Sequence, residues 1–298
     1  KSGDILFPSD HMGDETHQIF SVSGKGGETR CLTPDHRGSQ TLFCANSKDG
    51  KKILFSSNKR DKRYFDTYVT EIKTGNEECI FRCDDPFPYT AIAWSKNEKY
   101  ILYQKFYSNS NQDLFLYDVA GKKFLNITEH TGTMKNTAGM FNKNADTVYF
   151  LSDYEREFIG LAYYKIKTSE IGWEQLEKWD ITNFTLSHDE KHLLYSINES
   201  GTSKLKMKNL KTGKVKSLKI PKGNCLAFNF TKDDKKIVII YDSPQNPNDI
   251  FVYDIKKAKF KQVTFSMIGG IPKNDFNAPQ SIKYNSFDGL EINGFLYV

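Results

Sequence analysis

The chain has 298 residues, of which 38% are hydrophobic and 14% aromatic. This apolar content is sufficient for a packed core, so a disordered polymer is excluded. The net charge of +5 arises from 42 basic and 37 acidic residues that are spread along the chain. We therefore expect no nucleic-acid partner, and we interpret the densest basic segment, "NKRDKR" at 58–63, as a solvated loop rather than a phosphate site.

No apolar run approaches the ~20 residues that a membrane helix needs, so we expect no membrane partner. The first residues, "KSGDILF", contain neither an initiating Met nor a signal peptide, which is compatible with a fragment. The five cysteines include no CxxC pair, and the six histidines show no HExxH spacing. The sequence therefore predicts no metal, no cofactor and a reducing, cytoplasmic location.

A short β-rich triplet recurs along the chain at steps of 48, 48, 47, 45 and 44 residues. The six triplets are Ile5-Leu6-Phe7, Ile53-Leu54-Phe55, Ile101-Leu102-Tyr103, Val148-Tyr149-Phe150, Leu193-Leu194-Tyr195 and Ile237-Val238-Ile239. Each triplet after the first follows a tight polar turn, at 48–52, 96–100, 143–147, 188–192 and 232–236. An apolar strand precedes each turn, at 42–46, 91–95, 138–142, 183–187 and 226–230. Third strands are clearest at 66–72, 113–119 and 249–255, and a fourth at 259–265.

Four short antiparallel strands that repeat about every 45 residues are the signature of a β-propeller, in which each blade buries both faces only against its neighbours. No segment of convincing length has the 3.6-residue period of a helical solenoid. We therefore expect an all-β propeller over residues 1–275, with Trp94 packing between blades. The repeats are expected at about 1–35, 36–84, 85–130, 131–178, 179–221 and 222–268. The first repeat lacks its innermost strand, so six and seven blades both fit.

The loops between second and third strands vary in length and chemistry, and we place them at 56–65, 104–112, 152–160, 196–203 and 241–248. Strand alternation puts these loops on one face, beside the linkers between blades, where functional residues tend to concentrate. The loop "SDYEREFIG" at 152–160 contains Glu155, Arg156 and Glu157. Two carboxylates with a positioning guanidinium can hold a cation such as a peptide amine. The alternative is a solvated acidic loop.

The final residues, "SFDGLEINGFLYV" at 286–298, predict a strand launched by the turn Asp288-Gly289. Its apolar residues share one parity, the pattern of a half-buried strand: Leu290, Ile292, Leu296 and Val298. The strand follows the last blade and has no predicted partner. We therefore expect residues 276–298 to be a linker and the first strand of a further domain.

Several segments carry a resemblance to a known family. They are "SDYEREFIGLAYYKI", "WDITNFTLSHDEKHLLYSINESGTSKL", "YDSPQNPNDIFVYDI" and "QSIKYNSFDGLEINGFLYV". These segments resemble the propeller of bacterial serine peptidases of the prolyl oligopeptidase family, which includes dipeptidyl and acylaminoacyl peptidases. In that family a "SFDGLxIxGxLY" segment starts the α/β-hydrolase domain. The resemblance implies that the final strand belongs to such a domain and that the catalytic residues lie beyond Val298.

No G-x-S-x-G nucleophile elbow occurs in the sequence, so we assign no catalytic residue and expect this chain alone to be inactive. The resemblance implies a propeller that gates and positions short peptides for its own catalytic domain. In dipeptidyl members a pair of propeller glutamates binds the substrate amine. Glu155 and Glu157 are the nearest counterparts here, although they are not adjacent. The alternative is a free-standing TolB-like propeller that binds proteins or ligands.

Overall fold

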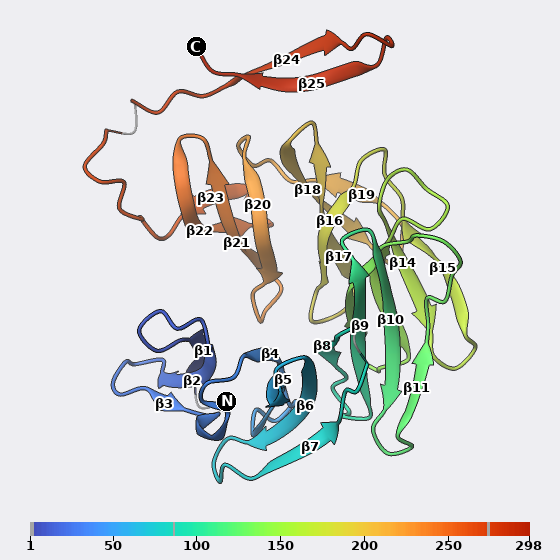
Figure 1. Cartoon of the computed structure of the whole chain (residues 1–298). Helices are drawn as coiled ribbons and strands as arrows, with labels where there is room; N and C mark the ends of the chain where they lie inside the picture. The colour runs from blue at the N-terminus through green and yellow to red at the C-terminus, as the bar shows by residue number, and fades with distance from the viewer. Residues whose placement is uncertain (1–2, 86, 273–274) are drawn as a thin grey trace. The chain divides into compact units, whose positions relative to one another are not determined.

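The chain folds almost entirely into β-strands (Figure 1). The structure is a computed structural model that describes residues 3–85, 87–272 and 275–298. One 3₁₀ turn, η1 (Pro34–His36), lies between the strands of the first two sheets. None of the helices in the described residues has the length and apolar character that a membrane crossing requires.

Six sheets follow one another along the chain, and the strand order in each follows the chain order. The first is β1 (Asp4–Ser9), β2 (Gln18–Ser23) and β3 (Arg30–Cys31). The second is β4 (Thr41–Asn46), β5 (Lys52–Asp61), β6 (Tyr64–Glu71) and β7 (Glu77–Phe81). The third is β8 (Tyr89–Trp94), β9 (Tyr100–Ser108), β10 (Asn111–Asp118) and β11 (Lys123–Asn126).

The last three sheets have the same four-stranded plan. The fourth is β12 (Asn136–Phe141), β13 (Thr147–Ser152), β14 (Gly160–Lys165) and β15 (Glu170–Gln175). The fifth is β16 (Ile181–Leu186), β17 (His192–Glu199), β18 (Thr202–Asn209) and β19 (Val215–Ser217). The sixth is β20 (Asn224–Phe230), β21 (Lys236–Ser243), β22 (Asn246–Asp254) and β23 (Lys259–Gln262). Neighbouring strands run antiparallel, as β5 with β6 and β21 with β22. These sheets are the six blades of a β-propeller, so the predicted fold class is confirmed.

The six predicted triplets all lie in equivalent strands, namely β1, β5, β9, β13, β17 and β21. The first blade has three strands in the described residues, and β1 occupies the second position, as the sequence predicted. The five polar turns also fall where they were expected, each between the first and second strand of a blade. The 45-residue period therefore gave the register of the blades correctly.

Four of the five polar turns repeat one set of side-chain hydrogen bonds. In the second blade Ser47 Oγ donates to Asp49 Oδ1 (2.7 Å) and accepts from the Lys52 N–H (2.9 Å). The first of these two bonds recurs in the pairs Ser95–Asn97, Ser187–Asp189 and Thr231–Asp233. Side chains thus satisfy the backbone groups that a reversal of the chain leaves unpaired.

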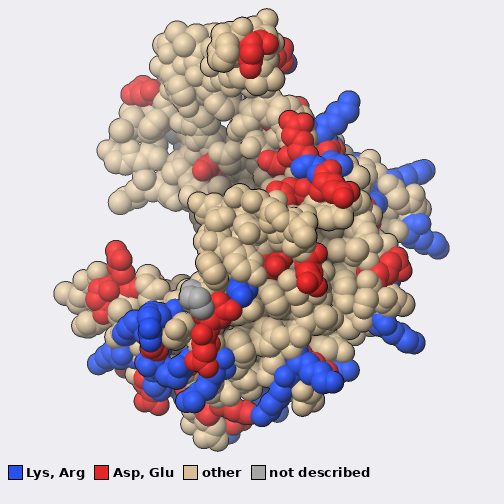
Figure 2. Space-filling view, turned by 45° about the vertical axis from the view of Figure 1, so that its right-hand side comes forward, with Lys and Arg blue, Asp and Glu red and all other residues tan. Residues whose placement is uncertain are grey.

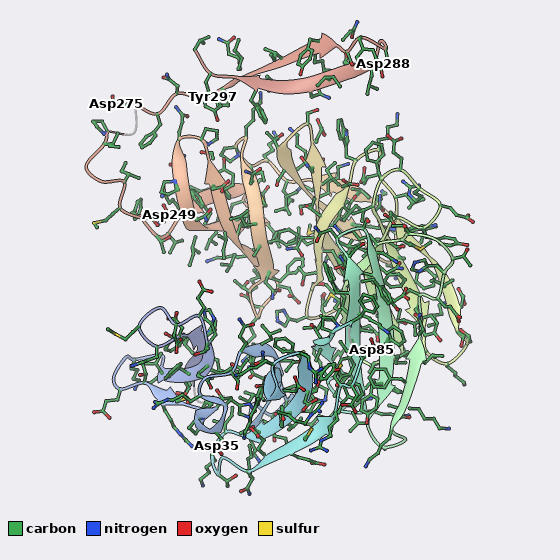
Figure 3. The ribbon with its side chains drawn as sticks, viewed as in Figure 1. Asp35, Asp85, Asp249, Asp275, Asp288 and Tyr297 are labelled. Carbon is green, nitrogen blue, oxygen red and sulfur yellow. The ribbon has the colours of Figure 1, made fainter. Side chains whose placement is uncertain are left out.

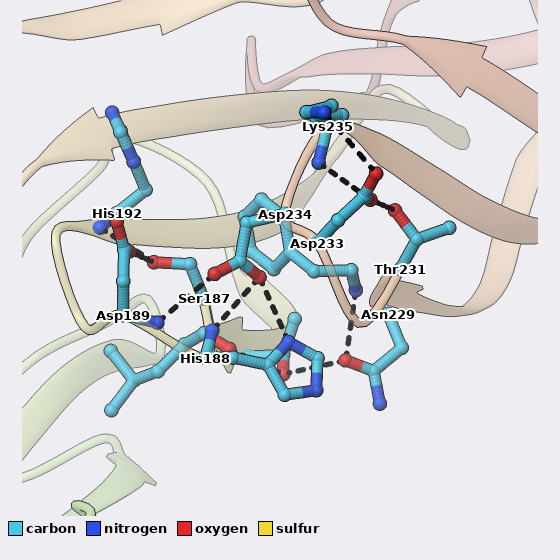
Figure 4. A network of polar contacts seen from close by, with 12 residues as sticks. Ser187, His188, Asp189, His192, Asn229, Thr231, Asp233, Asp234 and Lys235 are labelled. Atoms are coloured by element: carbon cyan, nitrogen blue, oxygen red, sulfur yellow. Dashed lines mark hydrogen bonds and ion pairs between the residues drawn. The ribbon is translucent and has the colours of Figure 1, made fainter.

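Two of these turns also bond to each other (Figure 4). Asp234 Oδ1 accepts from the His188 N–H (2.9 Å) and from His188 Nδ1 (2.8 Å), while Oδ2 accepts from the Asp189 N–H (3.0 Å). Burial acts to raise the pKa of Asp234, but the hydrogen bonds from His188 and Asp189 outweigh it and lower the pKa below 3.8. The fifth and sixth blades are therefore linked by polar contacts as well as by apolar packing.

An aspartate near the start of the third strand fixes the outer part of three blades. Asp66 accepts two hydrogen bonds from Arg60 (2.7 and 2.9 Å) and one from the Cys83 N–H (2.9 Å). Asp113 in the third blade accepts hydrogen bonds from the side chains of Asn126 and Thr128. Asp249 in the sixth blade, which Figure 3 labels, accepts hydrogen bonds from the Thr264 hydroxyl and the Ser266 N–H. Each carboxylate thus ties the third strand to the segment around or beyond the fourth.

The apolar cores lie between successive blades. Phe55 packs with Ile19 of the first blade, and Phe150 packs with Leu102 and Leu114 of the third. Trp94 packs against the core around Tyr103, as predicted. Within each unit, successive blades therefore bury apolar faces against one another, as the repeat implied.

The chain divides into two compact units, and each is described separately. The first unit comprises residues 1–155 and 161–174, and the second comprises residues 156–160 and 175–298. Blades one to three lie in the first unit with most of the fourth, and blades five and six lie in the second.

The final strand differs from the prediction. β25 (Glu291–Leu296) pairs antiparallel with β24 (Gln280–Asn285) in a two-stranded sheet, so it does have a partner within the chain. The expected half-buried parity holds only in part, because Ile292 is half-buried between the exposed Glu291 and Asn293, whereas Leu290 and Leu296 are 62% and 41% exposed. Because most residues of β24 are polar, the sequence did not indicate a strand that could pair with β25.

We predict that Asp66→Asn lowers the free energy of unfolding by about 1.5–3 kcal/mol, because Asp66 is buried and its charged hydrogen bonds to Arg60 are lost. Urea denaturation measures this change. Asp84→Asn is the control, since Asp84 also pairs with Arg60 (3.1 Å) but is 77% exposed and should contribute less than about 1 kcal/mol. Equal losses in the two variants would contradict the assignment of Asp66 as the structural partner.

Candidate functional site

The connections between second and third strands are mostly shorter than the sequence suggested. Four of them are two-residue turns, at 62–63, 109–110, 200–201 and 244–245, because the flanking strands extend into the predicted loops. The expectation of long variable loops at 56–65, 104–112, 196–203 and 241–248 is therefore wrong. Longer connections occur at 153–159 and at 10–17, and the second of these was not singled out from the sequence.

The loop 153–159 contains the three residues that the sequence singled out. Glu155 and Glu157 are exposed, whereas Arg156 is half-buried. Glu155 adopts a positive φ of 49°, a conformation that bends the chain sharply and is uncommon for residues other than glycine. The structure thus places two carboxylates on the surface of one short loop.

Arg156 anchors the loop through backbone carbonyls. Its Nε donates to the Phe158 carbonyl (3.1 Å) and its Nη2 to the Glu177 carbonyl (3.1 Å). The Ile159 N–H also donates to Asp180 Oδ1 (2.8 Å). These bonds tie residues 156–159 to the segment that follows β15, so Arg156 can hold the loop in one conformation.

Glu177 connects this loop to the core of the fifth blade. Its carboxylate accepts from the Tyr195 hydroxyl (2.7 Å) and from Lys206 Nζ (2.9 Å). Burial, followed by the hydrogen bond to Glu177, raises the pKa of Tyr195, so this hydroxyl stays protonated and donates. The sequence predicted Tyr195 only as a core residue and gave no signal for Glu177.

A cavity of about 450 Å³ lies in the second unit, between the turns of blades five and six and the β24–β25 hairpin. Its lining includes Gly201 and Gln245 from those turns, Lys222 from the linker between blades, and Phe295 and Tyr297 from the hairpin (Tyr297 is labelled in Figure 3). Turns and linker therefore share one face in this unit, as predicted.

The segment "NKRDKR" takes part in internal ion pairs. Besides the contact of Arg60 with Asp66, Arg63 pairs with Asp61 at 2.7 Å. Figure 2 likewise shows basic and acidic side chains next to one another on the visible face. Arg60 and Arg63 are therefore paired within the chain, but the predicted solvated loop is wrong, because residues 58–61 lie in β5 and Asn58 is buried.

Ser57, His36 and Glu77 have the connectivity of a catalytic triad. His36 Nδ1 lies 2.8 Å from Ser57 Oγ, and its Nε2 lies 2.9 Å from Glu77 Oε2. Ser57 and His36 are fully buried, however, and the imidazole packs edge-on against Phe55 and Tyr68. A substrate has no access to Ser57 Oγ, so these residues stabilise the contact between the first two blades.

The six antiparallel sheets that follow one another along the chain define a β-propeller. Residues 43–266 match the family model described as "Prolyl oligopeptidase, N-terminal beta-propeller domain". This match covers about three quarters of the chain, so the chain belongs to the prolyl oligopeptidase family. The resemblance of the sequence segments is confirmed.

Individual proteins that match this chain have low sequence identity to it. Dipeptidyl aminopeptidase BIII of Pseudoxanthomonas mexicana is 28% identical over 80 residues, which are 27% of this chain and 12% of that protein. Prolyl oligopeptidase B from Galerina marginata, solved with a 25mer macrocyclization substrate, matches with a TM-score of 0.74 and 14% identity over 98% of this chain and 45% of that one. TolB from Acinetobacter baumannii matches with a TM-score of 0.67 and 18% identity over 87% of this chain and 63% of that one.

The two structural matches show the fold alone, because their identities are low. The chain spans less than half the length of the matched peptidase, and the 80 aligned residues cover about an eighth of the curated relative.

We predict that Glu77→Gln lowers stability near neutral pH and reduces the loss of stability in acid. Burial acts to raise the pKa of Glu77, but hydrogen bonding and charge from His36, with help from Thr70, lower it below 4.5. A depressed carboxyl pKa contributes stability above the unfolded value and loses it as the pH falls through the folded value. Urea midpoints measured between pH 7 and pH 3 test this. Parallel profiles for the variant and the parent would contradict it.

Proposed function

We propose that this propeller is the non-catalytic domain of a serine peptidase and that it gates and positions short peptides for an α/β-hydrolase domain joined through residues 276–298. Membership of the prolyl oligopeptidase family is the observation that carries the proposal. The sequence contains no G-x-S-x-G motif, which supports a role in selecting substrates rather than in the chemistry itself.

The β24–β25 hairpin supports the position of the catalytic domain. Its two faces differ, because Ser281 and Phe295 line the cavity of the second unit, whereas Tyr284 and Leu296 lie on the other parity and are 55% and 41% exposed. An apolar sheet face that remains exposed is suited to pack against a further domain. We propose that the hydrolase domain covers this face.

Within this role, we propose that Glu155 and Glu157 bind the free amine of the peptide and that Arg156 positions the loop. Two exposed carboxylates on a loop that is anchored at its base make a charge-assisted acceptor. The likeness to a dipeptidyl aminopeptidase agrees with recognition of an amine. An amine held at a fixed distance from the catalytic serine would set which bond is cut.

A cytoplasmic location is also proposed. The five cysteines, Cys31, Cys44, Cys79, Cys83 and Cys225, are free thiols. Burial raises the pKa of Cys44 and Cys225 to about 12, so both stay protonated and unreactive. Free thiols of this kind fit a reducing compartment.

The second candidate function is a free-standing propeller that binds a protein or ligand. The match to TolB favours this second function, because the match covers 63% of the TolB chain but only 45% of the chain of prolyl oligopeptidase B. The two functions differ in whether a G-x-S-x-G motif follows in the same reading frame.

We predict that this chain alone hydrolyses neither dipeptidyl nor acyl-peptide chromogenic substrates, because it contains no nucleophile elbow. Release of the chromophore in a continuous assay provides the measurement. Turnover that a serine-directed fluorophosphonate abolishes would overturn the assignment.

The amine-binding role is tested in the whole peptidase with one peptide in free and N-acetylated forms. We predict that Glu155→Gln and Glu157→Gln lower kcat/KM for the free peptide by about 5- to 150-fold, which corresponds to ~1–3 kcal/mol, and leave the acetylated peptide nearly unchanged. Glu28→Gln, another exposed glutamate, is the control. Equal losses on both peptides would indicate a structural role, and no loss on either would leave a solvated acidic loop; both results contradict the proposal.

A further inference from the structure

The outer half of the fifth blade is more basic than the rest of the chain. Residues 200–231 contain eight lysines and no aspartate or glutamate, although basic and acidic residues nearly balance over the whole sequence. This segment includes β18, β19 and the linker to the sixth blade, and all of it lies in the second unit (β18 and β19 are labelled in Figure 1). A segment with charges of one sign attracts groups of the opposite sign.

A second cavity, of about 320 Å³, lies at one end of these strands. Lys204 and Lys206 of β18 line it together with Ser217 of β19 and Lys222 of the linker. Ser217 lies opposite Lys206 across the β18–β19 pair, and the side chains of opposite residues share one face of a sheet. Lys204, two residues before Lys206, lies on the same face. Two ammonium groups and a hydroxyl therefore project from one face of the blade, beside the linker.

The carboxylates near the cavity leave one positive charge. Lys206 Nζ pairs with Glu177 (2.9 Å), and Glu199 is the acidic residue of the lining. Lys204 and Lys222 have no carboxylate partner among the described residues. Two carboxylates thus accompany three ammonium groups, so the site suits a single carboxylate better than a doubly charged phosphate.

The segment after β19 adds apolar groups to the same lining. Leu218 is buried, Ile220 is half-buried, and Pro221 follows it. The methylene groups of an acidic side chain can pack on such a surface while the carboxylate stays beside the ammonium groups. Pro221 and Lys222 also line the cavity of about 450 Å³ beside the hairpin, so the two cavities adjoin.

Glu177 connects this cavity to the loop 153–159. Its carboxylate pairs with Lys206, and its backbone carbonyl accepts from Arg156 Nη2 (3.1 Å). Glu157, the neighbour of Arg156, is exposed. The second unit thus carries an exposed carboxylate and a lysine-lined cavity on segments that contact the same residue. A peptide with a free amine and an acidic side chain has the charges that complement both.

We propose that this cavity binds the carboxylate side chain of an acidic peptide, with Lys204 and Lys222 as charged contacts and Ser217 as a hydrogen-bond donor. The inference rests on the proposed peptidase function, which supplies the peptide, and adds a preference for acidic substrates. Lysines on an edge strand can also serve only to prevent aggregation. Lys216 separates the two roles, because it lies opposite Met207 and therefore on the other face.

The probes are alanine tetrapeptide amides with a free amine and with glutamate at the second, third or fourth position, each compared with its glutamine counterpart. Calorimetry with this chain measures binding, and the NMR shifts of the Ser217 and Leu218 backbone amides locate it. We expect at least one glutamate peptide to bind about tenfold more tightly than its counterpart and to shift both amides. Added salt should reduce this preference. A glutamine peptide with a free C-terminal carboxylate should not reproduce it.

Three variants test the contacts. Lys204→Gln and Lys222→Gln should each reduce the preference for glutamate about threefold, and the double variant should abolish it. Lys216→Gln, the same change on the other face, should leave the preference intact. The proposal is overturned if the unaltered chain binds the glutamate and glutamine peptides equally, or if the free-acid glutamine peptide binds more tightly than every glutamate amide. A preference that persists in the double variant, or an equal loss in Lys216→Gln, would also overturn it.

Cleavage separates a failure of this inference from a failure of the peptidase role. In the whole peptidase the same preference should appear in kcat/KM for cleavable versions of the peptides. Cleavage without a preference would overturn the carboxylate site and leave the peptidase role. A preference in binding without any cleavage would support the site and contradict the peptidase role.

Discussion

A small four-stranded sheet has two apolar faces and can bury them only between two neighbours, and the rest of this structure depends on that constraint. The second strands of blades two to five show its effect, since Phe55, Tyr103, Phe150 and Tyr195 are almost completely buried. Because every blade needs the next one, the period of the chain stays close to 45 residues. The residues of the strands are consequently constrained by packing, so we expect functional residues to lie in the connections at the ends of the blades.

Polar groups at the ends of the strands form hydrogen bonds that connect the packed core to surface loops. Tyr195 lies in a core strand, its hydroxyl bonds to Glu177, and the carbonyl of Glu177 accepts from Arg156. The position of residues 156–159 therefore follows from the packing of the fifth blade. A loop held in this way loses little conformational entropy when it binds a ligand, which makes it better suited to recognition than a mobile loop of the same composition.

The sequence predicted the blades because triplets and polar turns repeat with local chemistry that can be recognised in single segments. It did not predict the long hairpins, since residues such as Asn58 and Arg60 are polar and were assigned to a loop. In the structure they lie in β5, where Asn58 bonds to the Gln40 N–H and Arg60 to Asp66. Buried or half-buried polar residues in strands are stable only with partners, and such partners are distant in sequence.

The candidate site shows the same limit. Glu155, Arg156 and Glu157 were identified from charge and from family resemblance, but their anchor, Glu177, has no motif. The contact of Ser57 with His36 and Glu77 also joins residues that are 21 and 41 positions apart, so no local pattern indicates it. The three-dimensional structure was needed to find the role of Glu177 and the contact of Ser57 with His36 and Glu77. The burial of Ser57 and His36 then identified that contact as structural rather than catalytic.

We propose that the propeller admits short peptides to a catalytic domain and excludes folded proteins. The most direct test measures kcat/KM of the whole peptidase for one cleavable sequence, presented first as a short peptide and then within a loop of a stable folded protein. The account predicts efficient cleavage of the peptide and almost none of the folded protein, with cleavage restored when the protein is unfolded. Similar values of kcat/KM for the peptide and the folded protein would contradict it.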